Sequence, residues 1–198
     1  MTGSQRLVLA GAIAAMLGGL FWAMKATGLM VARYQPPVVY EIAPIFFAFA
    51  VIGLHASLGA SRSRLARAGL VLAGIAELCA VVAALGQFLG PADWIPTGDT
   101  VTVLTPFITL SMLGSVAGLL LVGLVVRRTA ALPGRWAGYP LALAISVIPL
   151  IASSAVFQAI HPRLFELPTL VVGLGWIVLG AVMARRPPTR PGEHPEDA

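Results

Sequence analysis

Charged residues are scarce in this chain: Asp, Glu, Lys and Arg make up 11% of its 198 residues. An ordinary soluble domain carries about 25% charged residues. Hydrophobic residues reach 58% and the mean hydropathy is +0.90, so a folded chain of this length would expose too much apolar surface in water. The scarcity therefore excludes a typical water-soluble domain and predicts that lipid surrounds the protein.

Sequence features of enzymes and cofactor proteins are also missing. The one cysteine, Cys79, lies in an apolar segment, so no intrachain disulfide can form. The chain has no HExxH, GxSxG or Walker sequence and no aspartate cluster suited to magnesium. His55 and His161 fall in opposite halves of the predicted membrane span, which excludes a haem held between them. We predict no cofactor and no metal, and an enzyme acting on lipid ranks third among the functions considered.

Long apolar segments are what the chain does contain. Each has the roughly 20 residues that a helix needs to span about 30 Å of hydrocarbon. Lipid offers the backbone no hydrogen-bond partner, so helices are required, and the alternation typical of barrel strands is absent. We predict an all-α membrane protein, a six-transmembrane-helix bundle in residues 1–184, with helices at 7–30, 42–60, 68–90, 101–126, 136–160 and 167–184.

Basic residues fall mainly on alternate connections of this bundle. Only Lys25, Arg33 and Arg163 lie on one side, and the other ten are Arg6, Arg62, Arg64, Arg67, Arg127, Arg128, Arg135, Arg185, Arg186 and Arg190. The positive-inside rule therefore predicts that both termini are cytoplasmic. Residues 185–198, rich in Pro, Arg and acidic residues, are expected to form a disordered cytoplasmic tail. The Ala-, Gly- and Arg-rich composition is typical of a GC-rich bacterial genome and predicts a bacterial inner membrane.

The net charge of +5 does not indicate nucleic acid, because the arginines flank apolar segments instead of alternating with aromatics on a polar face. The expected partner is the lipid bilayer. Small residues recur at helical spacing at Gly11, Ala15 and Gly19 and again at Ser111, Gly114, Ser115 and Gly118. Such faces serve helix packing within a bundle, or contact with a second copy or another membrane protein.

Glu77 is the leading candidate for a chemical role. It lies near the predicted bilayer midplane, where an ionised carboxylate is expensive unless it is paired or faces water. Such residues act as proton or cation sites in transporters; the alternative is a protonated Glu that hydrogen-bonds a neighbouring helix. Its candidate partners at similar depth are His55, Ser111, Ser115 and Ser146. Lys25 lies nearer the outer end of its helix and is expected to snorkel to the interface beside Trp22.

Two further sets of polar residues are candidates for ligand contact. Pro149 interrupts the fifth segment and is followed by Ser153 and Gln158, a stripe that could line a cavity because proline frees a backbone carbonyl. The outer loops carry a second set, for which solvated loop residues are the alternative: Arg33, Glu41, Asp99, His161, Arg163 and Glu166.

Two functional classes follow from these residues. The first is a small transporter or permease-like carrier, proton- or cation-coupled, with Glu77 as the titrating group. In it Ser111, Ser115, Pro149, Ser153 and Gln158 would line the path. The second is a non-catalytic membrane subunit that assembles through small-residue faces. The direction in which Glu77 and the stripe of the fifth segment point discriminates between them.

Overall fold

A computed structural model describes residues 3–34, 39–59, 63–95 and 101–185, without the side chains of residues 39–41. Throughout these ranges the regular secondary structure is helical, and no strand occurs in them. This confirms the helical class predicted from the sequence. The predicted disordered tail lies, apart from Arg185, outside the described residues.

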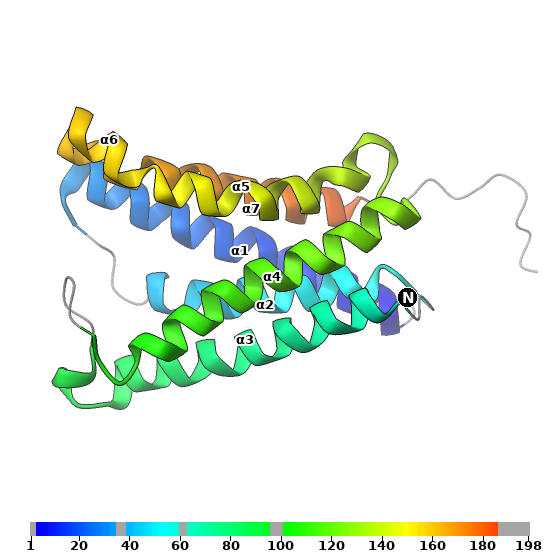
Figure 1. Cartoon of the computed structure of the whole chain (residues 1–198), viewed down its shortest axis with the longest axis horizontal. Helices are drawn as coiled ribbons and strands as arrows, with labels where there is room; N and C mark the ends of the chain where they lie inside the picture. Colours follow the sequence, from blue (N-terminus) through cyan, green and yellow to red (C-terminus); the bar gives the residue numbers. More distant parts are fainter. Residues whose placement is uncertain (1–2, 35–38, 60–62, 96–100, 186–198) are drawn as a thin grey trace, which may run out of the picture.

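Seven α-helices make up the described part of the chain (Figure 1). They are α1 Gly3–Ala32, α2 Val39–Ala56, α3 Arg64–Leu89, α4 Thr105–Thr129, α5 Tyr139–Ala152, α6 Ser154–Ile160 and α7 Leu167–Ala184. Short 3₁₀ turns lie between them: η1 Ala92–Trp94, η2 Gly134–Gly138 and η3 Pro162–Glu166.

Among the described residues, five helical stretches are long and apolar enough to cross a membrane, and Ile42–Ala56 in α2 is a shorter apolar one. Two of the five include a preceding 3₁₀ turn, since they run over Gly134–Ala152 and Pro162–Ala184. These lengths and compositions indicate a multi-pass membrane protein.

The predicted fifth helix, 136–160, is not continuous. It divides into η2, α5 and α6, with the break at Ser153. Pro149 lacks the N–H that would bond the preceding turn, and Ser153 N–H is shared between the carbonyls of Pro149 and Leu150 at 3.0 and 3.1 Å. The chain tightens at this point and resumes as α6.

The second helix ends four residues earlier than predicted. After Ala56 the backbone forms i→i−3 bonds from Ser57, Leu58 and Gly59. Gly59 has a φ of +58°, the left-handed conformation that terminates many helices and that glycine adopts without strain. His55 consequently lies in the last turn of α2.

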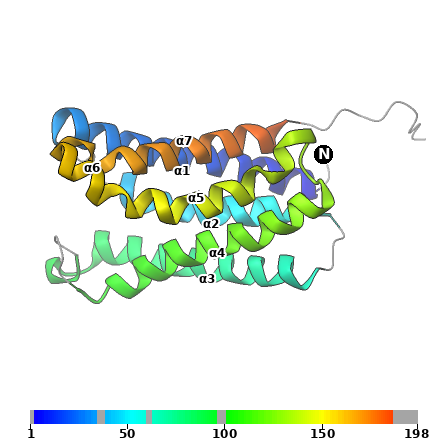
Figure 2. The ribbon, with the colours of Figure 1, turned by 45° about the horizontal axis from the view of Figure 1, so that its top comes forward.

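The long helices lie side by side in a bundle (Figures 1 and 2). α1 packs between α2 and α7, α3 packs on α4 and α2, and α5 packs on α4 and α7. α2 contacts α1, α3 and α4 and therefore joins the two parts of the bundle.

Glycines set the closest helix crossings. A Cβ built on Gly11 of α1 would lie 2.6 Å from the Cα of Gly53 of α2, and one built on Gly173 of α7 would lie 2.7 Å from Gly19 O of α1. Gly69 of α3 and Gly118 of α4 approach each other similarly. The small-residue stripes of the first and fourth segments therefore pack within the chain, as small residues do between membrane helices.

α3 shows that the bundle is adapted to an apolar solvent. Its buried positions are all Ala or Gly: Ala66, Gly69, Ala73, Ala76, Ala80, Ala83 and Ala84. Its large side chains point outward instead, among them Val71, Ile75, Leu78, Val82 and Leu85. In water this distribution would leave a wide exposed apolar face, whereas lipid solvates it.

The start of α1 and the end of α7 lie at the same end of the bundle, because the two helices are antiparallel with Gly19 near Gly173 and Ala12 near Gly180. The guanidinium groups of Arg135 and Arg185 lie 5.4 and 5.8 Å from the ring centroid of Trp136 at that end. Such cation–π contacts hold the end of α7 against η2.

The glycine crossings predict a contrast between two alanine substitutions. Gly11→Ala should lower the free energy of unfolding by about 1–3 kcal/mol, because the new methyl group meets the backbone of α2. Gly74→Ala is the matched control, since a Cβ at Gly74 has nothing within 4 Å, and it should be neutral or slightly stabilising. Unfolding in mixed detergent micelles measures both. Equal stability of the two variants would contradict the close α1–α2 crossing.

Candidate functional site

An ion pair lies near one end of the bundle. Lys25 Nζ of α1 is 3.0 Å from Glu166 Oε1 at the end of η3, and the two side chains are 13% and 8% exposed. Lys25 lies seven residues before the end of α1, which is about 10 Å along the helix axis. At that depth each charge needs a partner, and the pair provides one.

This pairing corrects two expectations. Lys25 was predicted to snorkel to the interface, but its side chain is mostly buried against Glu166. Glu166 was predicted as one of several outer-loop ligand residues, yet it is buried at the junction of η3 and α7. The physical reason is that α1 packs against η3, so the two opposite charges neutralise each other inside the bundle.

Glu77 has a different environment. It lies mid-way along α3, four residues after the fully buried Ala73 and three before the buried Ala80. Its Oε2 is enclosed and has no hydrogen-bond partner within the described ranges. An ionised carboxylate without a partner is costly in such surroundings, so the geometry favours a neutral carboxyl group at Glu77.

His55 does not pair with Glu77. Its Nε2 is enclosed and has no hydrogen-bond partner in the described part of the chain, and no ion pair or hydrogen bond links it to Glu77 there. His55 lies one residue before the end of α2, whereas Glu77 lies thirteen residues into α3, about 20 Å from the start of that helix. The early end of α2 thus separates the two side chains along the bundle axis.

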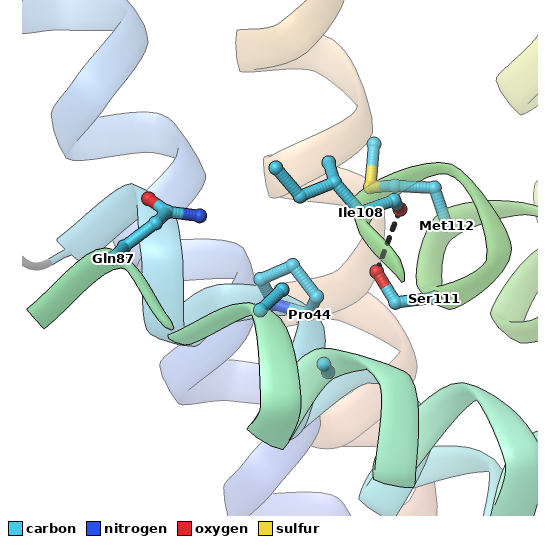
Figure 3. A pocket seen from close by; sticks show the side chains of 7 residues that line it. Pro44, Gln87, Ile108, Ser111 and Met112 are labelled. Carbon is cyan, nitrogen blue, oxygen red and sulfur yellow. Dashed lines mark hydrogen bonds between the residues drawn. The ribbon is translucent and has the colours of Figure 1, made fainter. Parts of the chain in front are cut away.

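Two small cavities meet at the crossing of α2 and α4. Both are lined by Pro44 of α2 and Met112 of α4, which therefore form a common wall. The first, of about 10 Å³, also contacts Ala80, Ala83, Gln87, Ile108 and Ser111. In Figure 3, Pro44 lies between Gln87 and the turn of α4 that carries Ser111, whose hydroxyl donates to Ile108 O at 2.8 Å.

The second cavity, which we call the central cavity, has a volume of about 20 Å³. Its lining comes from five helices: Trp22, Pro44, Phe47, Met112, Ser115, Val116, Val147, Val172 and Trp176. Phe47 stacks on Trp176 with ring centroids 4.5 Å apart, and Trp22 meets Phe47 edge-on at 5.1 Å. Trp22 Nε1 and Ser115 Oγ are both buried without a hydrogen-bond partner among the described residues.

Ser111 and Ser115 are thus brought to the bundle interior, but the stripe of the fifth segment is not. Pro149 and Gln158 are exposed, and neither lines either of these cavities. Ser153 uses its hydroxyl to bond Leu150 O within its own turn. From this part of the chain only Val147 reaches the central cavity.

The other outer-loop candidates take local backbone roles where they are described. Arg33 is exposed with a φ of 54°, and Tyr34 N–H after it donates to Gly28 O at 3.2 Å, which closes the end of α1. His161 Nδ1 accepts a hydrogen bond from Arg163 N–H at 3.1 Å and so caps η3. Asp99 and the side chain of Glu41 lie outside the described residues.

Within the described ranges no group of three or more His, Cys, Asp or Glu side chains could hold a metal ion. Two features were not predicted from the sequence. They are the Lys25–Glu166 pair and the position of Trp22 on the wall of the central cavity. The signal for the pair was the presence of opposite charges at the same end of the predicted bundle. Trp22 gave no signal, because a tryptophan near a membrane interface normally predicts an aromatic belt.

Comparison of the chain with protein-family models, with curated proteins and with solved structures finds no match.

The buried ion pair predicts non-additive mutations. Lys25→Met should lower the free energy of unfolding by about 3–5 kcal/mol, because it leaves the Glu166 charge uncompensated in the bundle. Adding Glu166→Gln to Lys25→Met should recover much of that loss, since the second substitution removes the orphaned charge. Equilibrium unfolding in mixed micelles gives the coupling energy of the double-mutant cycle. Arg163→Gln, an exposed charge in the same turn, is the control and should be nearly neutral. Additive effects of Lys25→Met and Glu166→Gln would contradict the pairing.

Proposed function

We propose that this chain is a small transporter or permease-like carrier with six transmembrane helices, and that Glu77 binds the coupling proton or cation. The observation that carries the proposal is the enclosed carboxyl oxygen of Glu77, which has no hydrogen-bond partner in the described structure. A carboxyl group kept in a membrane span without a structural partner is expensive, and exchange of a proton or cation is the common use of such a group.

Glu166 differs from Glu77 in having an oppositely charged partner. Glu166 is also enclosed, but it is neutralised by Lys25 and has a clear structural role. Among the described residues Glu77 has no ion pair, and its enclosed Oε2 has no hydrogen bond, so a structural role does not account for it there. Replacing Glu77 by Gln should therefore cost the fold little, whereas a proton site would lose its function.

The polar lining of α3 and α4 supports a path beside Glu77. On α3, Ala80 follows Glu77 by three residues and Gln87 follows Ala80 by seven. This spacing places the three residues near one face of the helix. Ala80 and Gln87 line the smaller cavity together with Ser111. In this proposal that smaller cavity is the closed form of the path, and Met112 on its wall is the side chain that moves.

The proposed topology counts α2 as a sixth span and places both termini in the cytoplasm of a bacterial inner membrane. Supporting it, the described arginines at one end of the bundle include Arg6, Arg64, Arg67, Arg127, Arg128, Arg135 and Arg185. Such an excess of basic residues is typical of the cytoplasmic side. Residues 1–184 form one transmembrane domain in this proposal.

The alternative is a non-catalytic subunit that assembles with a second copy or another membrane protein. It has less support, because the small-residue faces of α1 and α4 pack against α2, α7 and α3 inside the chain. A partner would have to dock on the large outward-facing side chains, which lipid solvates equally well.

Chemical modification tests the state of Glu77. A hydrophobic carbodiimide adds across its C=N bond the O–H of a neutral carboxyl group, and the adduct rearranges to a stable N-acylurea with no leaving group. We expect labelling of Glu77 in membranes at neutral pH, located by peptide mass spectrometry, and no labelling of the ion-paired Glu166. Glu77→Gln should abolish the adduct. Labelling of Glu166 but not Glu77 would overturn the proposed proton site.

A ligand screen tests the carrier function itself. Wild type and Glu77→Gln are compared in lipid nanodiscs by thermal unfolding against pH, Na⁺, K⁺ and a panel of small solutes. A ligand of the folded state raises stability by RT ln(1 + [L]/Kd), about 2.7 kcal/mol at a hundredfold excess over Kd. We expect a cation or a change of pH to raise the thermal stability of the wild type but not that of Glu77→Gln, with both proteins folded. Equal responses of the two proteins, together with a co-purifying fixed partner, would favour the assembly subunit instead.

A further inference from the structure

The central cavity has features of a built site that the proposed role of Glu77 does not use. Trp22 and Ser115 both line it, and they are 3% and 4% exposed. Their polar atoms, Trp22 Nε1 and Ser115 Oγ, have no hydrogen-bond partner within the described ranges. Leaving a buried donor unsatisfied costs about 1–3 kcal/mol, so two residues with such groups on the wall of one cavity are the basis for inferring a polar occupant.

The volume limits the size of this occupant. A buried water needs at least about 10–15 Å³ measured by a water-sized probe, together with two to four polar partners. The central cavity, at about 20 Å³, exceeds that requirement and is of a size for one water-sized molecule.

The neighbouring cavity provides an internal comparison. It measures about 10 Å³, and the hydroxyl of Ser111 on its wall already donates to Ile108 O. Its volume is therefore at the lower limit for a water molecule, and the serine hydroxyl on its wall already has an acceptor. Ser111 and Ser115 lie one helical turn apart on α4. The hydroxyl of Ser111 has an acceptor, whereas that of Ser115 has no partner among the described residues.

The lining also fixes the charge of the occupant. None of the nine residues that line the central cavity is ionisable. An ion there would lose its hydration without gaining a counter-charge, at a cost far above that of burying a neutral molecule. Trp22 Nε1 can only donate, whereas a serine hydroxyl can donate or accept.

We propose that the central cavity is a binding site for one neutral, water-sized molecule that accepts a hydrogen bond from Trp22 Nε1–H and exchanges a second with Ser115 Oγ. Water is the occupant under ordinary conditions. The occupant links α1 to α4. Phe47 of α2, Val147 of α5 and Trp176 of α7 complete the wall of the cavity. It does not depend on Glu77, which does not line this cavity.

The test is nuclear magnetic resonance of the full chain in nanodiscs, with the indole nitrogens of its four tryptophans labelled. Signals are assigned with single Trp→Phe variants. Trp94 is 37% exposed and provides the positive control for water contact. We expect the buried Trp22 indole proton to show magnetisation transfer from a long-lived water molecule as well.

Three variants locate the contact. Ser115→Ala should remove or weaken the transfer to Trp22, whereas Ser146→Ala is the matched control and should leave it unchanged, because the Ser146 hydroxyl bonds Leu143 O. Val172→Ile keeps both polar groups and fills the cavity with one more methylene. It should abolish the transfer, and transfer that persists there would come from the Ser115 hydroxyl instead of water.

Absence of water contact at Trp22 in the wild type, with Trp94 in contact, would overturn the site. Contact that survives Ser115→Ala unchanged would overturn the bridge between the two residues. Neither result bears on carbodiimide labelling of Glu77, so failure of this site and failure of the proposed proton site are distinguishable.

Discussion

Close backbone approach at glycines is the constraint on which the rest of this structure depends. Lipid tails are as apolar as leucine, so membrane helices gain little from burying large side chains and associate where small residues let backbones meet. Here Gly11 meets Gly53 and Gly19 meets Gly173, which places α1 between α2 and α7. That placement in turn carries Lys25 to Glu166 and Trp22 to the central cavity. The polar contacts of the interior are thus consequences of glycine positions that hold no chemistry themselves.

The class of the protein could be predicted from the sequence because it rests on composition and length. The sixth apolar segment, 167–184, coincides with α7, since Pro168 and the basic tail define its ends. Helix interruptions were harder to predict. Proline is tolerated within membrane helices, so Pro149 alone did not indicate whether α5 would bend or break, and the break depends on the bonds that Ser153 makes. The end of α2 at Ala56 was missed because the apolar pattern continues through Leu58.

The roles of individual side chains could also be predicted only in part. Ser111 and Ser115 share a helical face with Gly118, so their burial follows from the packing stripe that the sequence shows. The partners of charged residues depend instead on which helices become neighbours, and one sequence holds no information on that. Their expected depth in the bilayer predicted that Lys25 lies at the interface and that His55 is a partner of Glu77. Depth was insufficient in both cases, because α1 packs against η3 and α2 ends early.

Glu166 and Glu77 show why the presence or absence of an interaction partner is a better indicator of function than burial. Glu166 and Glu77 each have one oxygen that is buried without a hydrogen bond in the described structure. A charge that the fold neutralises, as Lys25 neutralises Glu166, contributes to holding α1 against η3 and is accounted for by structure. A carboxyl group that the fold leaves without a partner is retained at a net cost, which selection for stability alone would remove by a change to an apolar residue. Among the described residues Glu77 belongs to the second kind, and Trp22 Nε1 and Ser115 Oγ are likewise buried there without a hydrogen-bond partner. Such polar groups are the basis of the two proposals, a proton or cation at Glu77 and a neutral molecule in the central cavity.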